Sequence, residues 1–256
     1  MKKTLGVFPR ATRLASCMLL ALSLYGCGTT LQPQAGQGSV TTFTVSLANV
    51  HVVDAYGKRF MIDSGKHGDE QELIAAMLAA GINPQSIDYL IITHGHTDHA
   101  GGARYFKDHF GIPIIAGRGD QDMLAAGKNS TLCSTGLLAS FLKPSIERES
   151  YPPVAADIWI DEHYDLAGLG ASGRIVSVPS HTPGSIALII DDKGWVGDLV
   201  RGGLISKSKP ARHFYMCDLP SNDRDIKALL SDEMVKIWYT GHMGPVSAQA
   251  VREQFE

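Results

Sequence analysis

The feature that most constrains this chain is a cluster of three histidines and one aspartate at the end of an apolar segment. Residues 87–93, Ile-Asp-Tyr-Leu-Ile-Ile-Thr, have the composition of a buried β-strand, and they lead directly into His94, His96, Asp98 and His99. In α/β folds, active sites open at the carboxyl ends of strands. We therefore expect an α/β protein with a functional site at the end of this strand.

The spacing of these four side chains suits metal ions. His94 and His96 share one side of an extended segment because successive side chains alternate. Asp98 and His99 follow on the turn, where they can face a second, adjacent point. Neutral imidazoles and carboxylates suit Zn²⁺, and Fe and Mn accept the same atoms. The cluster therefore predicts a centre for two metals, with two Zn²⁺ per chain expected.

The rest of the chain predicts alternating strands and helices. Its 256 residues, 44% of them hydrophobic, supply ample material for a sizeable core. Strands are expected at residues 45–55, 59–62, 87–93, 112–116, 175–178, 185–190 and 194–196, and helices at residues 69–80, 102–110, 223–230 and 247–255. Residues 128–150 show no clear period and are expected to form a loop-rich insertion.

Four further segments resemble landmarks of the metallo-β-lactamase fold superfamily, in that superfamily's order around the histidine cluster. They are Met61-Ile62-Asp63-Ser64-Gly65, Pro179-Ser180-His181-Thr182-Pro183-Gly184-Ser185, Val196-Gly197-Asp198 and Thr240-Gly241-His242. The resemblance covers roughly residues 41–256, with Ser180 where the family usually has Gly. It implies a four-layer αββα sandwich, in which two mixed sheets pack face to face with helices outside and the metals at one edge.

The resemblance also implies a role for each matched side chain. The first metal would be bound by His94, His96 and His181, and the second by Asp98, His99 and His242. Asp198 would bridge both metals, and Asp63 would be an acceptor that orients the ligand imidazoles. Asp98, His99 and Asp198 would also take part in catalysis.

This ligand set predicts a hydrolase. Two cations about 3.5–4 Å apart lower the pKa of a shared water and polarise a carbonyl group. No Ser or Cys nucleophile is then needed, and the sequence contains no G-x-S-x-G elbow. The expected reaction is hydrolysis of a small-molecule ester, thioester, lactone or related acyl bond by a metal-bridging hydroxide. Asp198 favours the glyoxalase II and lactonase-like branches, because class B1 β-lactamases have a cysteine there and class B3 enzymes lack the bridging carboxylate.

Several residues outside the motifs have weaker interpretations. Arg201 could bind an anionic substrate group or be a surface cation, and Tyr215 and Tyr239 are weak candidates for oxyanion donors. The histidines without motif support are interpreted as surface or packed residues; they are His51, His67, His109, His163 and His213. His67 alone follows the Asp63 loop, at the expected rim of the site.

Two other functions remain open at this stage. The persulfide dioxygenase branch shows the same His-x-His-x-Asp-His pattern but uses a single iron and consumes O₂. A membrane-tethered metal-binding protein without catalysis would also keep the ligands. Thiol-dependent O₂ uptake with iron would identify the first, and unchanged ester turnover after removal of the ligands would show that the assigned centre is not the catalyst.

The first 26 residues predict a lipoprotein signal peptide. A basic start is followed by a 12-residue apolar run, residues 14–25, which ends in Leu24-Tyr25-Gly26-Cys27 and resembles a lipobox. Cys27 would carry the lipid, palmitate included, and residues 27–40 would form a flexible tether before the domain at 41–256. We therefore expect an exported protein anchored in a bacterial envelope membrane, with the outer membrane favoured. The alternative is a plain signal peptide with an incidental cysteine.

The charge balance and the hydropathy exclude some classes of binding partner and of protein, and the cysteines leave one question open. Without residues 1–26 the chain has 19 Lys+Arg against 26 Asp+Glu, and this acidic balance argues against binding to nucleic acid. No apolar stretch reaches the roughly 18–20 residues of a spanning helix, which excludes a polytopic membrane protein. Cys133 and Cys217 could form a disulfide or remain separate buried thiols. The oligomeric state is not predicted.

Overall fold

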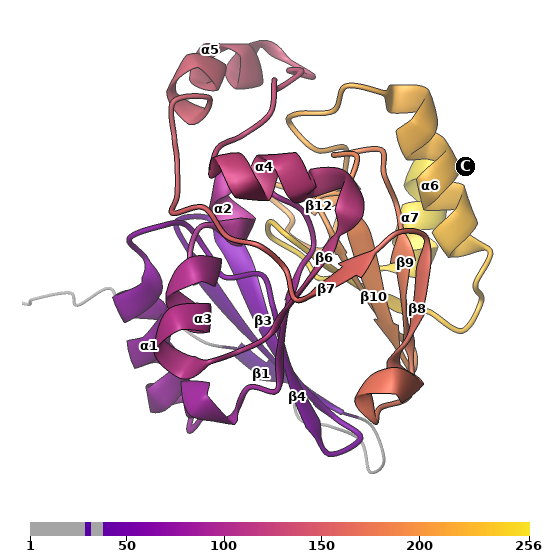
Figure 1. Cartoon of the computed structure of the whole chain (residues 1–256). Coiled ribbons are helices and arrows are strands. Elements are labelled where there is room, and N and C mark those ends of the chain that lie inside the picture. Colours follow the sequence, from indigo (N-terminus) through magenta and orange to yellow (C-terminus); the bar gives the residue numbers. More distant parts are fainter. Residues whose placement is uncertain (1–28, 32–37) are drawn as a thin grey trace, which may run out of the picture.

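The structure, a computed structural model, describes residues 29–31 and 38–256 and contains two mixed β-sheets (Figure 1). The first has the strand order β1-β2-β3-β4-β5-β6-β7, and the second has the order β15-β14-β11-β10-β9-β8. The first is made of β1 (Thr29–Leu31), β2 (Ser39–Val45), β3 (Ala48–Ala55), β4 (Lys58–Ile62), β5 (Tyr89–Ile92), β6 (Ile114–Gly117) and β7 (Ile158–Ile160). The second is made of β8 (His163–Asp165), β9 (Arg174–Ser177), β10 (Ile186–Ile190), β11 (Lys193–Gly197), β14 (Ile237–Thr240) and β15 (Val246–Ser247).

An apolar layer joins the two sheets face to face. Ile62 and Ile91 of the first sheet and Leu188 and Trp195 of the second are buried in one cluster. Because β5 and β6 run parallel to their neighbours and are covered on both faces, their sequences are continuous apolar runs rather than alternating patterns.

Helices cover the outer face of each sheet (Figure 1). α1 (Glu70–Ala79) and α3 (Ala103–Phe110) pack on the first sheet, and α6 (Leu219–Leu230) and α7 (Ala248–Phe255) pack on the second. The order of layers is helix, sheet, sheet, helix, so the predicted four-layer αββα sandwich is confirmed.

The predicted strands and helices are present, with shifted ends. The largest shift is in α6, which begins at Leu219 instead of residue 223. Within the predicted strand at 45–55, a turn at Ser46 and Leu47, both with positive φ, separates β2 from β3. The sequence analysis did not predict the strands β1, β7, β8, β14 and β15 or most of β2. It also did not predict the following elements: α2 (Thr97–Ala100), α4 (Gln121–Ala126), α5 (Leu137–Ile146), β12 (Arg201–Gly202), β13 (Pro210–Ala211) and 3₁₀ turns at Pro84–Ser86, Arg118–Asp120 and Leu166–Leu169.

The expected loop-rich insertion at 128–150 contains a helix, so that prediction is wrong for its second half. In α5 the apolar residues Leu137, Leu138, Phe141 and Leu142 recur at helical spacing, a pattern that the surrounding Gly, Ser and Pro residues obscured. The helix lies apart from the two sheets (Figure 1). It exposes much of this apolar face, with Leu137 and Phe141 at 92% and 82% exposure.

The N-terminal predictions are tested only in part. Thr29–Leu31 pairs with Val40–Thr42 at the edge of the first sheet, and β2 begins at Ser39, so strand residues occur within the segment expected to be a tether. Cys27 and the predicted signal peptide lie outside the described residues. Among the described residues, no helix has the length and apolar character needed to cross a membrane.

Candidate metal centre

The motif residues meet at one edge of the sandwich. His94 follows β5, and His181 precedes β10 on a neighbouring loop. Asp198 follows β11, and His242 follows β14, the strand that runs parallel to β11. Because parallel strands present their carboxyl ends at the same edge, residues distant in the sequence become neighbours.

The carboxylate of Asp198 lies at the middle of this cluster. Its Oδ2 is within 3.0–3.7 Å of one ring nitrogen from each of five histidines: His94, His99, His181, His213 and His242. Asp98 Oδ2 adds a second carboxylate, 3.3 Å from His242 Nε2 and 3.7 Å from His99 Nε2. His96 joins through its Nδ1, which lies 3.1 Å from His181 Nε2.

These side chains fit metal ions. Two donors bound tetrahedrally to one Zn²⁺ at about 2.0–2.1 Å lie about 3.3 Å apart, which is close to the spacing observed. His94 Nε2, His181 Nδ1 and Asp198 Oδ1 are buried and have no hydrogen-bond partner, and such orphaned atoms are costly unless a ligand satisfies them. Four combinations could hold an ion: His94/His96/His181, His94/His99/Asp198, Asp98/His99/His242 and His181/Asp198/His213.

Asp63 hydrogen-bonds to the outer nitrogen of His99, on the side of that ring away from the other ligands. Its Oδ2 accepts from His99 Nδ1 at 2.8 Å and from Thr93 Oγ1 at 2.8 Å, and its Oδ1 accepts from Thr93 N at 2.7 Å. The contact to His99 leaves His99 Nε2 facing the other ligands, which is the geometry expected of a residue that orients a ligand. His242 is held in the same way, with Nδ1 2.8 Å from the Leu47 carbonyl oxygen.

Asp120 is a buried aspartate that the sequence analysis missed. It accepts from Gly95 N at 2.7 Å, from Thr182 Oγ1 at 2.7 Å and from Gly184 N at 2.8 Å. It therefore joins the loop that bears His94 and His96 to the loop that bears His181. Its place just after β6, at the same sheet edge, is the one signal that could have identified it.

His213 is the second missed residue. Interpreted from sequence as a surface or packed histidine, it is buried, and its Nε2 lies 3.0 Å from Asp198 Oδ2. No motif surrounds it in the sequence. The other histidines without motif support lie elsewhere: His51 is buried against Thr42 and Thr240, and His67 pairs with Glu70.

The histidines of the cluster fall into two groups by the direction in which burial and neighbouring charges shift their pKa. Burial lowers the pKa of His96 and of His213 to about 4, so both rings are neutral at physiological pH. Burial also opposes the charge on His242, but Asp198 and Asp98 outweigh it and raise its pKa to about 10. The same two carboxylates raise the pKa of His99 well above its ordinary value, again against burial.

A pocket of about 320 Å³ opens directly above the centre. Its floor includes His96, Asp98, Asp198, His213 and His242. Its walls are mostly apolar and come from α5, the segment before it, the 213–215 segment and the turns at 46–47 and 243. They include Leu47, Leu132, Leu138, Leu142, Ile146, Phe214 and Met243. The helix α5 is therefore a cover over the metal centre.

The residues proposed to bind substrate are placed differently from expectation. Arg201 stacks over the Phe214 ring at 4.0 Å and does not line this pocket, so its role as a direct anion ligand is not supported. Tyr215 lines the pocket, but its hydroxyl already donates to the Ala139 carbonyl at 3.0 Å. Tyr239 is buried in the core, stacked on Trp195, which corrects its assignment as an oxyanion donor.

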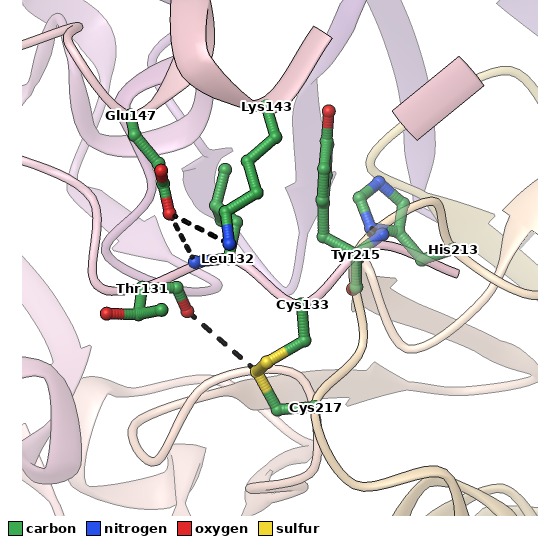
Figure 2. The surroundings of a disulfide bond; sticks show 8 residues. All are labelled: Thr131, Leu132, Cys133, Lys143, Glu147, His213, Tyr215 and Cys217. Atoms are coloured by element: carbon green, nitrogen blue, oxygen red, sulfur yellow. Dashed lines mark hydrogen bonds and ion pairs between the residues drawn. A yellow bond between two sulfur atoms is a disulfide. The ribbon is translucent and has the colours of Figure 1, made fainter. Parts of the chain in front are cut away.

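A disulfide joins the insertion that contains α5 to the segment that carries His213. Cys133 and Cys217 are bonded, which decides between the two alternatives left open by the sequence (Figure 2). Met216 N donates to the Cys133 carbonyl at 2.8 Å, and Tyr215 pairs with Ser134 in an isolated β-bridge. In Figure 2, His213 and Tyr215 lie on the segment that leads into the disulfide, so the covering insertion and the His213 segment are joined as one unit.

The chain matches a known family over most of its length. Residues 43–231 match the Metallo-beta-lactamase superfamily. The chain is 29% identical over 188 residues to the hydroxyacylglutathione hydrolase GloC of Haemophilus influenzae, an alignment covering 71% of this chain and 78% of the relative. It is 24% identical to the beta-lactamase-like protein 2 homolog of Caenorhabditis elegans, over 82% of this chain and 60% of that protein.

Solved structures show the same fold. The metallo-beta-lactamase SMB-1 in complex with mercaptoacetic acid aligns with a TM-score of 0.59 at 17% identity, covering 83% of this chain and 80% of that chain. BJP-1, a subclass B3 metallo-beta-lactamase of Bradyrhizobium japonicum, aligns with a TM-score of 0.57 at 15% identity, covering 87% and 81%. At these identities the likeness concerns the fold.

Proposed function

Because the chain belongs to the metallo-beta-lactamase superfamily, we propose that it is a dinuclear zinc-dependent hydrolase of a small acyl substrate. The single observation that carries the proposal is the position of Asp198, whose Oδ2 lies within 3.0–3.7 Å of five imidazole nitrogens. An oxygen so placed can contact two cations, as a bridging ligand must.

The side chains that would hold the ions fall into two groups around Asp198. The first ion would be held by His94, His96 and His181, and the second by Asp98, His99 and His242. When bound, such a pair of cations supplies a nucleophile derived from water at neutral pH and polarises the carbonyl group of the substrate.

The chain's own groups support acyl transfer to water. Burial alone would raise the pKa of Asp98, but the imidazoles of His99 and His242 outweigh it and hold that pKa well below its usual range. Asp98 therefore stays ionised at the pocket floor, in the form that can bind a cation and accept a hydrogen bond from the attacking water. Apolar side chains of α5 line the same space.

The pocket favours a substrate with an apolar acyl portion. Leu138, Leu142 and Phe214 face the metal centre from above and offer contacts to hydrocarbon. A thioester is the first candidate among the acyl bonds, because one relative is named a hydroxyacylglutathione hydrolase. Esters and lactones use the same chemistry, and β-lactams are the less favoured case.

The test is to measure substrate turnover by protein whose metal content is known. Purified protein would be stripped with chelator, reloaded with Zn²⁺, Mn²⁺ or Fe²⁺, and assayed on a thioester, an ester, a lactone and a β-lactam. We expect metal-dependent hydrolysis that falls on the order of 10²-fold or more in Asp198→Asn. The matched control is Asp161→Asn, whose exposed carboxylate pairs with Arg118. Thiol-dependent O₂ consumption with iron, and no hydrolysis, would replace the proposal with an oxygenase.

We further propose that the enzyme is exported and held on an envelope membrane by a lipid on Cys27. The support is the signal-like sequence of residues 1–26 together with the Cys133–Cys217 disulfide, because disulfides persist mainly in oxidising compartments.

A further inference from the structure

His213 is a buried histidine at the metal centre that belongs to none of the motifs. Its Nε2 lies 3.0 Å from Asp198 Oδ2, closer than the 3.4–3.7 Å that separates that oxygen from the motif histidines. Its ring centroid is 4.8 Å from that of His181 and 5.4 Å from that of His242. It therefore lies close to candidate ligands of both ions.

The ring of His213 is oriented as a ligand ring is. Its Nδ1 lies 3.2 Å from the Tyr215 carbonyl oxygen and 3.3 Å from the Tyr215 backbone nitrogen, and these contacts hold the ring with Nε2 directed at Asp198. His99 and His242 show the same arrangement, with the outer nitrogen against an acceptor and the inner nitrogen toward Asp198 Oδ2. In His99 and His242 this acceptor favours the tautomer in which the inner nitrogen is free to bind a metal. In His213 the Tyr215 carbonyl fits that tautomer and the Tyr215 N–H fits the other, so the position of Nε2 beside Asp198 carries the argument.

The position of His213 does not depend on a bound ion. Thr135 Oγ1 donates to the His213 carbonyl at 2.9 Å, and Thr135 N donates to the Phe214 carbonyl at 2.8 Å. Four residues further along, Cys217 is bonded to Cys133 (Figure 2). The backbone is thus held at His213 itself and again at Cys217, and such pre-positioning reduces the entropy lost when a ligand binds a metal.

We propose that His213 is an additional metal ligand, whose Nε2 binds the ion that Asp198 and His181 also contact. The proposal rests on the proposed dinuclear centre and adds one donor to it. His213 forms a candidate triad with His181 and Asp198, beside the triad His94/His96/His181, and it would raise to five the number of protein donors expected for the first ion. Zn²⁺ accepts five donors less readily than four, whereas ions that prefer higher coordination, such as Mn²⁺, are better satisfied.

The decisive measurement is the state of one ring nitrogen in the whole protein. Long-range ¹H–¹⁵N NMR of histidine-labelled protein, with and without Zn²⁺, distinguishes a protonated, a bare and a metal-bound Nε2. The His213 signals are assigned by their loss in His213→Gln. We expect Nε2 of His213 to be metal-bound and Nδ1 to be protonated after loading. A protonated Nε2 in the loaded protein would make His213 a hydrogen-bond donor to Asp198 and would overturn the proposal.

Metal affinity provides a second readout. In competition with a chelator, we expect His213→Gln to bind one of two Zn²⁺ at least about tenfold more weakly than the unmodified chain. The control is His163→Gln, an exposed histidine of β8 for which no change is expected. Unchanged affinity for both ions in His213→Gln would contradict the proposal. If that variant fails to fold, the His213 ring signals are assigned by through-bond correlation to the backbone of the unmodified protein, and its NMR still decides.

This test is independent of turnover. If Nε2 of His213 binds Zn²⁺ but the protein hydrolyses none of the substrates, the proposed function is refuted and this inference stands. If the protein hydrolyses a substrate while His213 Nε2 keeps its proton, this inference is refuted and the proposed function stands.

Discussion

Gly241 lies against Asp198 so closely that a Cβ at position 241 would be 2.3 Å from Asp198 Oδ1 and 2.6 Å from His99 Cε1. Real Cβ atoms do not approach other atoms so closely, so any side chain here displaces the central carboxylate. The absence of a side chain at position 241 is therefore a condition for the geometry of the metal centre.

Substitution Gly241→Ala is expected to disturb metal binding more than folding. The added methyl must push Asp198 or His99 aside, at a cost typical of overpacking, about 1–3 kcal/mol. We expect fewer than two Zn²⁺ per chain by elemental analysis, with circular dichroism unchanged. The control is Gly136→Ala, since a Cβ there meets nothing within 4 Å and φ is −172°. Full loading of Gly241→Ala with two ions would contradict this account.

Asp120→Ala is expected to destabilise the protein and weaken metal binding together. The change leaves the buried N–H groups of Gly95 and Gly184 and the hydroxyl of Thr182 without their acceptor, at about 1–3 kcal/mol for each unsatisfied group that water does not reach. Urea unfolding of the metal-free protein and chelator competition would measure the two effects. Asp122→Ala, an exposed neighbour in α4, is the control and should change neither.

Metal loading should release protons and strengthen as the pH rises. In the metal-free protein the pKa of His242 is about 10 and that of His99 is well above its ordinary value, so both rings are charged at neutral pH. A histidine must be neutral to bind a metal, so roughly one to two protons must leave per centre. Calorimetric titration with Zn²⁺ in buffers of different ionisation heat counts these protons. Affinity that stays constant from pH 6.5 to 8.5 would refute the expectation.

The same pKa shift has an opposite consequence for the metal-free fold. Because the pKa of His242 is raised on folding, its charged form stabilises the fold below its unfolded pKa of about 6.5. That contribution is lost as the pH rises from about 6.5 through about 10. Urea unfolding of metal-free protein across this range should show it, and His242→Gln should remove it.

Loss of the disulfide should loosen the cover over the site. The bond joins residues 84 positions apart, and the double variant Cys133→Ser, Cys217→Ser is expected to lose about 2–4 kcal/mol of stability. Because α5 forms the apolar wall, KM for an apolar acyl substrate should rise more than kcat falls. A reductant should reproduce the effect in the unmodified protein and have none in the double variant. Equal kinetics with and without the bond would show that it does not hold the pocket.

Cys27→Ser should move the protein from the membrane to a soluble fraction, because it removes the expected site of lipid attachment. Fractionation and immunoblotting of cells that express the whole chain would measure this. Cys17→Ser, inside the predicted signal, is the control and should leave the distribution unchanged. A mutant at position 27 that stays in the membrane would contradict the anchor.

The helix α5 is an element that the local sequence pattern was insufficient to predict. Its apolar residues have helical spacing, yet Leu137 and Phe141 are largely exposed, so burial in the core does not explain the helix. Contacts of Ala139 with Leu132 and Tyr215, and the neighbouring disulfide, hold it in place. These are contacts between distant segments, which a local period cannot reveal.

The sequence alone predicted the apolar strand at residues 87–93, the ligand cluster that follows it and the helices α1, α3, α6 and α7. Each of these depends on neighbours along the chain, whose side-chain directions follow from local geometry. Only the tertiary structure shows that Asp120 links the two ligand-bearing loops and that His213 lies beside Asp198. It also shows that Arg201 stacks on Phe214, that Tyr239 is buried in the core and that Cys133 pairs with Cys217. The physical reason is that these contacts exist only once two sheets pack and bring the ends of their strands to one edge.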